Sequence, residues 1–154
     1  FYSKEEIEET IYWLATNAQK FTMMVCTGNY PLSPKDANLN RIDEMKKMID
    51  GIEQASVGYS DHSLKMSVAY VAASKGITYL EKHFSLSRYL PQIPHQMYEG
   101  GPMITTHQVS IEPKELLDLA YWCAQADAIN GGREFKTNEM EKAIKNKYIN
   151  RYGK

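Results

Sequence analysis

Hydrophobic side chains recur along the chain with two alternating periods. Ser3 and Glu6 form a capping box, and the apolar residues that follow recur at helical spacing, which predicts a helix over residues 4–18. Residues 21–27 are instead a short apolar run that ends at Gly28. Such a run is typical of a strand that is buried on both faces of a parallel sheet.

The same alternation continues beyond this first pair of elements. Ser33 and Pro34 are residue types that cap and open a helix, and an apolar stripe follows them as far as Ile49. Gly58 weakens the next strand-like run, and Gly76 ends the helix that comes after it. In chain order, further helices are predicted over residues 34–49, 64–75 and 113–130, and further strands over residues 55–61 and 77–84.

Alternating helices and strands predict an α/β fold with a parallel sheet and right-handed crossovers. Three strands suit either part of a barrel or a small open sheet. Residues 86–111 are rich in proline and glycine, so we expect a long loop there rather than a packed element. Residues 130–154 are polar and basic, which indicates a linker or tail after a domain formed by residues 1–129.

Composition narrows the classes of protein to consider. At 154 residues, 43% of them hydrophobic, the chain is long enough for one core and too short for two ordinary domains. A formal charge of -1 provides no basic field, so we expect neither a nucleic acid nor a membrane surface as partner. Apolar runs are short and no basic-then-apolar leader opens the chain, so a soluble, cytoplasmic protein is expected. We expect Cys26 and Cys123, which are far apart in sequence, to be buried thiols.

Polar side chains are concentrated at the C-terminal ends of the predicted strands. Because residues two apart share a face of a strand, Ser60 lies on the face of His62, and Glu81 lies on the face of His83. Tyr30 follows the first strand. Barrels and open α/β sheets both place their ligands at these strand ends. Neighbouring strands are about 4.8 Å apart, so two imidazoles there can converge on one metal ion.

Each of these residues also has a purely structural interpretation. A histidine at a strand end is often a hydrogen-bonded residue of the fold, and Asp61 can orient the neighbouring ring or accept a turn hydrogen bond. Glu81 can form an ion pair with Lys82, and Tyr30 can pack as an aromatic anchor before Pro31. Spacing alone leaves metal binding and these alternatives open.

Four short motifs resemble those of a known family. They are Cys26-Thr27-Gly28-Asn29-Tyr30-Pro31, Gly58-Tyr59-Ser60-Asp61-His62-Ser63, Glu81-Lys82-His83-Phe84-Ser85 and Ser110-Ile111-Glu112-Pro113-Lys114-Glu115-Leu116. Their order and spacing over residues 1–129 closely resemble the N-acetylneuraminate (sialic acid) synthase family, which includes the legionaminic and pseudaminic acid synthases. The resemblance implies a (β/α)8 TIM barrel, of which the three strands here look like about the sixth to the eighth.

The resemblance also implies roles for individual residues. The matching positions are His62 and His83 as metal ligands, Tyr30, Asn29 and Ser60 in substrate binding, and Glu81 and Asp61 in catalysis. The metal would be Mn²⁺ or Mg²⁺, since few protein ligands and open positions for water and a substrate oxygen suit such ions.

The reaction that the resemblance implies joins phosphoenolpyruvate to an N-acetylated amino sugar similar to N-acetylmannosamine. A metal polarises the aldehyde of the open-chain sugar, and the methylene carbon of phosphoenolpyruvate attacks it. Water then adds to the resulting oxocarbenium centre and phosphate departs. The reaction is a condensation rather than a hydrolysis.

The sequence departs from the family in ways that affect both substrates. Gly28, Ser87 and Pro94 replace the residue types usual in the family, and residues 97–107 look like an insertion in which Glu99 could supply a replacement carboxylate. No residue matches the family's phosphoenolpyruvate-binding groups, and a barrel needs at least about 200 residues. We therefore expect a homodimer or a missing N-terminal half-barrel. The alternative functions are a non-catalytic remnant that binds a metal or a partner, and a structural remnant without a ligand.

Overall fold

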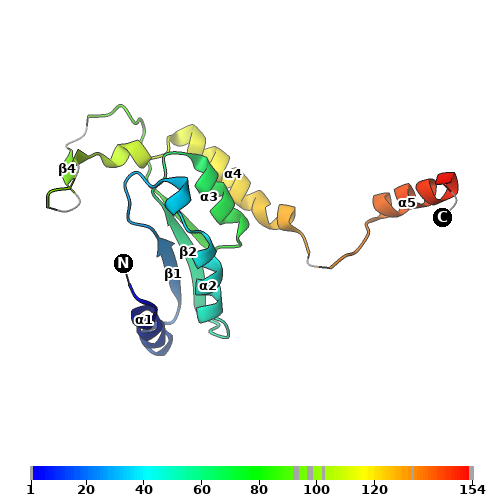
Figure 1. Cartoon of the computed structure of the whole chain (residues 1–154), viewed down its shortest axis with the longest axis horizontal. Helices are drawn as coiled ribbons and strands as arrows, with labels where there is room; N and C mark the ends of the chain where they lie inside the picture. Colours follow the sequence, from blue (N-terminus) through cyan, green and yellow to red (C-terminus); the bar gives the residue numbers. More distant parts are fainter. Residues whose placement is uncertain (1, 92–93, 97–98, 102, 133, 153–154) are drawn as a thin grey trace.

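The computed structural model describes every residue except 1, 92–93, 97–98, 102, 133 and 153–154. Helices and strands alternate along its body, as the sequence predicts (Figure 1). The elements of this body are α1 (Lys4–Asn17), β1 (Phe21–Cys26), η1 (Pro34–Asp36), α2 (Asn40–Met48), β2 (Ala55–Asp61), α3 (Met66–Ser74), β3 (Tyr79–Lys82) and α4 (Pro113–Asn130). The expected α/β class is confirmed.

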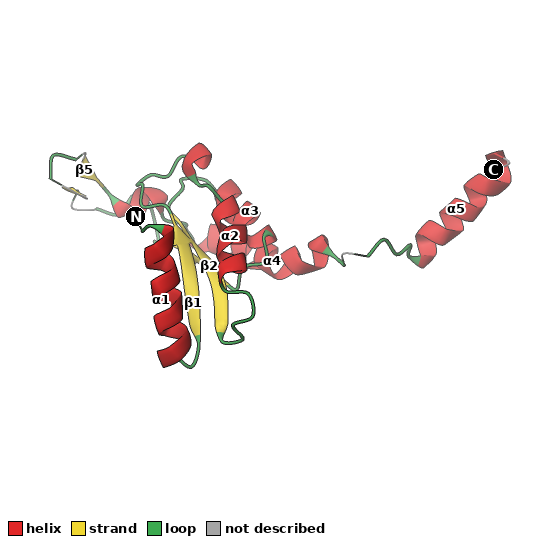
Figure 2. Ribbon diagram, turned by 60° about the horizontal axis from the view of Figure 1, so that its bottom comes forward, coloured by secondary structure: helices red, strands yellow, loops and turns green. Residues whose placement is uncertain are grey.

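The strands β1, β2 and β3 form one parallel sheet in chain order (Figure 2). Cys26 at the end of β1 lies opposite Ser60 of β2, and Asp61 at the end of β2 lies opposite Lys82 of β3. Because parallel strands in this register end at the same edge, the residues that follow β2 and β3 are neighbours in space.

The core lies on one face of the sheet, between the strands and the helices. Val25, Val57 and Tyr59 point to this face and are buried together with Ile11 of α1 and Ile42 of α2. A smaller cluster joins α3 to α4. The helices pack on one side of the sheet because the successive right-handed crossovers return on the same side.

No helix in the described part of the chain packs over the opposite face, and two predictions fail there. The side chain of Met24 is 38% exposed and that of Cys26 is also exposed, so β1 is not buried on both faces. Cys26 is therefore not the buried thiol that we expected, and Cys123 of α4 is only half-buried. The apolar character of β1 reflects a covering layer that these residues do not supply.

Gly58 has a specific reason to lack a side chain. A Cβ atom built at this position would lie 2.3 Å from Sδ of Met24 and 2.9 Å from the backbone oxygen of Tyr79. The glycine that weakens the prediction of β2 thus leaves room for the side chain of Met24 on the open face of the sheet.

The helix predicted over residues 34–49 is divided into η1 and α2. Asn38 has a φ of 50°, which is a left-handed conformation that interrupts a right-handed helix. Ser33 precedes η1 but makes no capping hydrogen bond with its side chain. The apolar stripe crosses this break, so its periodicity does not reveal it.

The third strand and the loop after it also differ from the prediction. β3 has four residues instead of the eight over 77–84, and beyond it Phe84 forms a single parallel bridge with Ile111. The expected loop over 86–111 contains regular structure: a ladder of β4 (His95–Gln96) with β5 (Met103–Ile104), and η2 (Thr106–Val109). The expected insertion at 97–107 lies partly outside the described residues.

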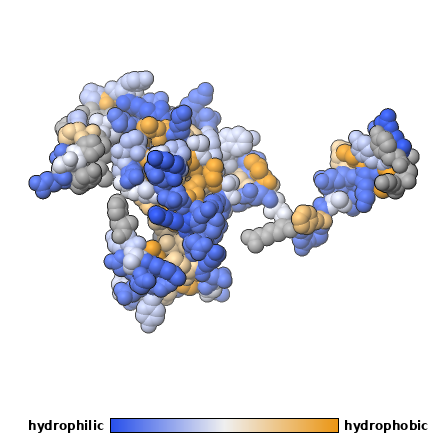
Figure 3. Space-filling view, viewed as in Figure 1, coloured by the Kyte–Doolittle hydropathy of each residue, from blue (hydrophilic) through white to orange (hydrophobic). Residues whose placement is uncertain are grey.

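The C-terminal segment contains a helix, α5 (Glu139–Tyr152), which both ribbon views show well apart from the body (Figures 1 and 2). Apolar side chains are visible on the surface of α5 and of the body (Figure 3). Among the described residues, no helix combines the length and the hydropathy needed to cross a membrane.

Candidate functional site

The imidazole rings of His62 and His83 lie side by side at the ends of two neighbouring strands. Their centroids are 5.4 Å apart and their planes are inclined by 71°. Tyr30, from the loop after β1, adds a third ring with its centroid 4.0 Å from that of His62 and 5.6 Å from that of His83. The structure therefore brings three of the predicted site residues together.

The contacts of His62 define which ring nitrogen carries the proton. Nδ1 lies 3.3 Å from the carbonyl oxygen of Thr27, which can only accept a hydrogen bond, so Nδ1 is the donor. Nε2 is then an acceptor, and the hydroxyl of Tyr30 lies 2.7 Å from it. The hydroxyl of Ser60 is 3.5 Å from the same nitrogen. In this tautomer the lone pair of Nε2 points toward the other predicted site residues.

Burial favours the neutral forms of His62 and Tyr30. It lowers the pKa of His62, against the hydrogen bond to Thr27, which favours the charged ring, and nearby His83 adds to the lowering. Burial likewise raises the pKa of the Tyr30 hydroxyl, and the negative charge of Glu81 adds to that increase. A neutral imidazole and a protonated phenol are the resulting forms.

Three further predicted residues border this cluster. Ser60 is buried and lies opposite Glu81 in the strand register, so their side chains share the face that the helices leave open. Glu81 is exposed, and so is Asn29 in the loop before Tyr30. The structure thus places Glu81 on the accessible face of the histidine pair, whereas Asn29 is an exposed neighbour of Tyr30 in the sequence.

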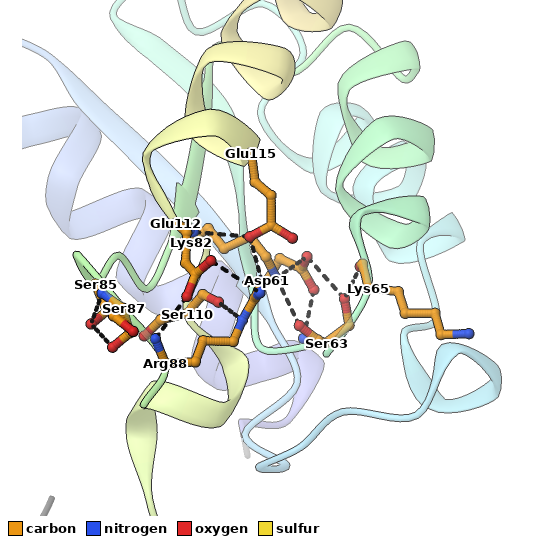
Figure 4. A network of polar contacts seen from close by, with 10 residues as sticks. All are labelled: Asp61, Ser63, Lys65, Lys82, Ser85, Ser87, Arg88, Ser110, Glu112 and Glu115. Carbon is orange, nitrogen blue, oxygen red and sulfur yellow. Dashed lines mark hydrogen bonds and ion pairs between the residues drawn. The ribbon is translucent and has the colours of Figure 1, made fainter. Parts of the chain in front are cut away.

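Asp61 does not join this group. Its carboxylate is fully buried on the helix-facing side of the sheet, 2.8 Å from Nζ of Lys82, and also accepts hydrogen bonds from Ser63 (Figure 4). The suggested ion pair between Glu81 and Lys82 is wrong, because adjacent residues of a strand point to opposite faces and Lys82 meets Asp61 instead.

The donors of the histidine pair fit a divalent metal ion that keeps several non-protein ligands. Within the described part of the chain, no three His, Cys, Asp or Glu side chains converge to hold an ion. A neutral imidazole whose Nδ1 donates to a carbonyl is the usual form of a metal-binding histidine. Mn²⁺ and Mg²⁺ accept few protein ligands together with water and substrate oxygens.

Sequence reasoning missed two polar groups near the strand ends. One is Ser63, whose backbone and hydroxyl both contact Asp61. The other is Arg88, whose Nε donates to the carbonyl of Ser110 at 2.8 Å and whose guanidinium pairs with Glu115 at the start of α4 (Figure 4). The alternation of side chains along a strand offered a signal for the pairing of Asp61 with Lys82, since each immediately precedes one of the two histidines. It offered none for Arg88.

Comparisons with known proteins agree with the motifs. The N,N'-diacetyllegionaminic acid synthase of Legionella pneumophila is 33% identical over 123 residues, which are 80% of this chain and 30% of that protein. The synthase of the same name from Campylobacter jejuni is 30% identical over 139 residues, or 88% of this chain and 37% of that protein. The chain thus spans about a third of the length of these relatives.

A solved structure supports the same relationship. The N-acetylneuraminic acid (sialic acid) synthetase of Leptospira borgpetersenii, crystallised with citrate, matches with a TM-score of 0.75 and 26% identity over 99% of this chain and 48% of that one. The chain therefore has the fold of part of that synthetase. A model of the NeuB family matches residues 2–134, a range that contains both histidines. With most of its length matched in this way, the chain belongs to the NeuB family.

Proposed function

We propose that this chain forms the metal-binding and sugar-activating part of a nonulosonic (sialic-type) acid synthase. The whole reaction would condense phosphoenolpyruvate with an N-acetylated amino sugar aldehyde and release phosphate. The observation that carries the proposal is the pair of imidazoles, 5.4 Å apart at adjacent strand ends, in a member of the NeuB family. Assignment of these strands as the sixth to the eighth of a barrel belongs to the same proposal.

His62 and His83 would hold Mn²⁺ or Mg²⁺ through ring nitrogens. A divalent ion bound there would polarise the aldehyde oxygen of the sugar. The hydroxyls of Tyr30 and Ser60 lie 2.7 and 3.5 Å from Nε2 of His62, so both can donate to sugar oxygens beside the aldehyde. Asn29, which is exposed and adjacent to Tyr30 in the sequence, would add a further contact to the sugar. These neutral donors suit a polyhydroxylated substrate.

The two predicted catalytic carboxylates receive different roles. Glu81 is exposed on the face of the histidine pair and can exchange a proton with the reacting groups. Asp61 is fully buried on the other face, where Lys82 and Ser63 occupy its oxygens. We therefore propose that Glu81 acts in proton transfer and that Asp61 acts only through the fold.

Groups that bind phosphoenolpyruvate would come from another part of the barrel. This substrate carries a carboxylate and a phosphate, which need cationic partners, and the relatives are about three times as long as the matched region. Among the described residues, β1 pairs with β2 alone, and its remaining edge is open to a further strand. On α4, the exposed side chains of Leu117 and Tyr121 offer apolar surface for the same purpose. We propose that an N-terminal half-barrel covers this edge and this surface. The homodimer would then form between two complete barrels.

The metal site is tested by measuring Mn²⁺ affinity. His62→Ala and His83→Ala each remove one of two protein ligands, so both should bind Mn²⁺ at least about tenfold more weakly than the wild type. His107→Ala, in η2, is the control for loss of a histidine outside the site. Unchanged affinity in either site variant would contradict the assignment.

Turnover is tested by phosphate release from phosphoenolpyruvate with N-acetylmannosamine and Mn²⁺. The chain alone should release none, because correct orientation of the second substrate is worth about 7–11 kcal/mol in favourable cases. Release should begin when the N-terminal barrel segment of a relative is supplied, and His62→Ala should abolish it. Metal binding without turnover in that complemented protein would favour the alternative of a non-catalytic metal-binding remnant.

A further inference from the structure

A buried ion pair lies directly behind the histidine pair. Asp61 and Lys82 are opposite each other in the register of β2 and β3, and their side chains point to the helix-facing side. The Nζ of Lys82 is 2.8 Å from Oδ2 of Asp61, and the exposed fractions of the two side chains are 2% and 0%. Both charges are therefore almost fully buried, and their hydrogen-bond partners are protein groups.

Ser63 completes the ion pair into a closed cluster. Its backbone N–H donates to Oδ1 of Asp61 at 2.9 Å, and its hydroxyl contacts Oδ2 at 3.0 Å. Lys82 in turn donates to the carbonyl oxygen of Ser63 at 2.8 Å. Figure 4 shows these three side chains between the end of the sheet and the start of α3. We call Asp61, Lys82 and Ser63 the strand-end clamp.

The clamp encloses His62 and adjoins His83 along the backbone. Asp61 precedes His62 and Ser63 follows it, while Lys82 precedes His83. The residues on both sides of His62 thus contact Lys82, the residue that immediately precedes His83. Sideways motion of one strand end against the other would break the ion pair and the hydrogen bond from Lys82 to the carbonyl oxygen of Ser63.

We propose that the strand-end clamp sets the spacing of His62 and His83, so that Asp61 and Lys82 are positioning residues for the metal site. This inference rests on the proposed function. Stability is a weak reason to keep such a cluster, because a buried ion pair costs desolvation energy and can often be replaced by neutral groups without loss. What the ion pair adds to the backbone ladder is a directional side-chain contact that joins the ends of the two ligand-bearing strands.

The test separates stability from position. Asp61→Asn and Lys82→Met each leave one buried charge unpaired, so both single variants should lose stability. The double variant Asp61→Asn/Lys82→Met removes both charges and should recover much of the thermal stability. Its Mn²⁺ affinity should nevertheless stay about 10- to 100-fold below wild type, the range typical when groups that orient metal ligands are removed.

A second measurement needs no metal. In the wild type, NMR cross-relaxation should connect the ring protons of His62 and His83, whose centroids are 5.4 Å apart. The double variant should lose this cross-peak. As a matched control, Asp43→Asn/Lys75→Met removes a more exposed ion pair between α2 and the end of α3 and should change neither measurement.

The outcomes distinguish this inference from the proposed function. If the wild-type chain shows the ring contact but binds no Mn²⁺, the proposed function is contradicted. The clamp is then tested by the ring contact alone, which should be lost in the double variant. A double variant that keeps both the ring contact and the wild-type affinity overturns the clamp. If that variant does not fold, Ser63→Ala is used instead, because it keeps both charges and loses only the hydroxyl contact with Asp61. It should weaken both the Mn²⁺ affinity and the ring contact. No change in either measurement would overturn the inference.

Discussion

Replacement of Tyr30 by Phe should make the chain bind Mn²⁺ more tightly. The Tyr30 hydroxyl lies 2.7 Å from Nε2 of His62, the nitrogen whose lone pair a metal would use. The two partners therefore compete for one lone pair, and a metal can bind only when the hydroxyl moves away. Phe keeps the aromatic ring that stacks on His62, with its centroid 4.0 Å from the imidazole, and removes only the competitor.

The expected gain follows from the hydrogen bond that need not be broken. A typical net hydrogen bond contributes about 0.5–1.5 kcal/mol. Every 1.4 kcal/mol corresponds to about tenfold in affinity, so Mn²⁺ should bind about 2- to 13-fold more tightly to Tyr30→Phe. The lower end is expected if water replaces the tyrosine at Nε2. Affinity for the sugar should fall in the same variant, since one neutral donor is lost.

Titration of free Mn²⁺ by electron paramagnetic resonance measures this affinity directly. Tyr59→Phe is the matched control: its buried hydroxyl has no hydrogen-bond partner among the residues that the structure describes, and it points to the helix-facing side of β2. That substitution should leave Mn²⁺ affinity unchanged and the stability equal or slightly higher. Equal or weaker binding by Tyr30→Phe, with an unchanged control, would show that the tyrosine does not compete for His62 and would refute the reasoning.

Other predictions concern the sheet, the loop and the metal. Gly58→Ala should lower the free energy of unfolding by about 1–3 kcal/mol in a denaturant titration, because the new Cβ overlaps Met24 and the backbone of Tyr79. Gly132→Ala is the control: its Cβ meets no atom of the described residues within 4 Å, so it should be neutral in the same titration. Arg88→Lys should cost about 1–3 kcal/mol, because a lysine cannot contact Ser110 and Glu115 together, and thermal unfolding would show no shift if the guanidinium is dispensable. Mn²⁺ at one hundred times its Kd should stabilise the fold by about 2.7 kcal/mol, and this increase should be absent in His62→Ala.

Period and parity in the sequence predicted the parts of the fold that local physics determines. The capping box of Ser3 and Glu6 forms as expected, and α1 begins at Lys4, directly after Ser3. The bounds of β2 match the predicted strand over residues 55–61. The placement of Ser60 beside His62, and of Glu81 opposite Ser60, follows from alternation along a parallel pair of strands.

Features that depend on a single backbone angle or on distant chain were not predictable. Asn38 breaks the second helix through one positive φ, which leaves the apolar spacing unchanged. The exposure of Cys26 and Met24 was missed for a different reason. Apolar sequence predicts that a strand is covered, but it does not say which part of a chain covers it, and no helix in the described residues packs over this face of β1.

Alternation of side chains along a strand also explains why each predicted metal-binding histidine follows a charged residue. In both, a charged residue immediately precedes the histidine, Asp61 in one and Lys82 in the other. Because adjacent residues point to opposite faces, the charges meet behind the sheet at 2.8 Å while the rings meet on its open face. A slip of β3 by one residue would exchange the faces and place Lys82 among the rings. The buried ion pair therefore opposes a displacement that would destroy the site, which is the physical reason to expect the position of the rings to depend on it.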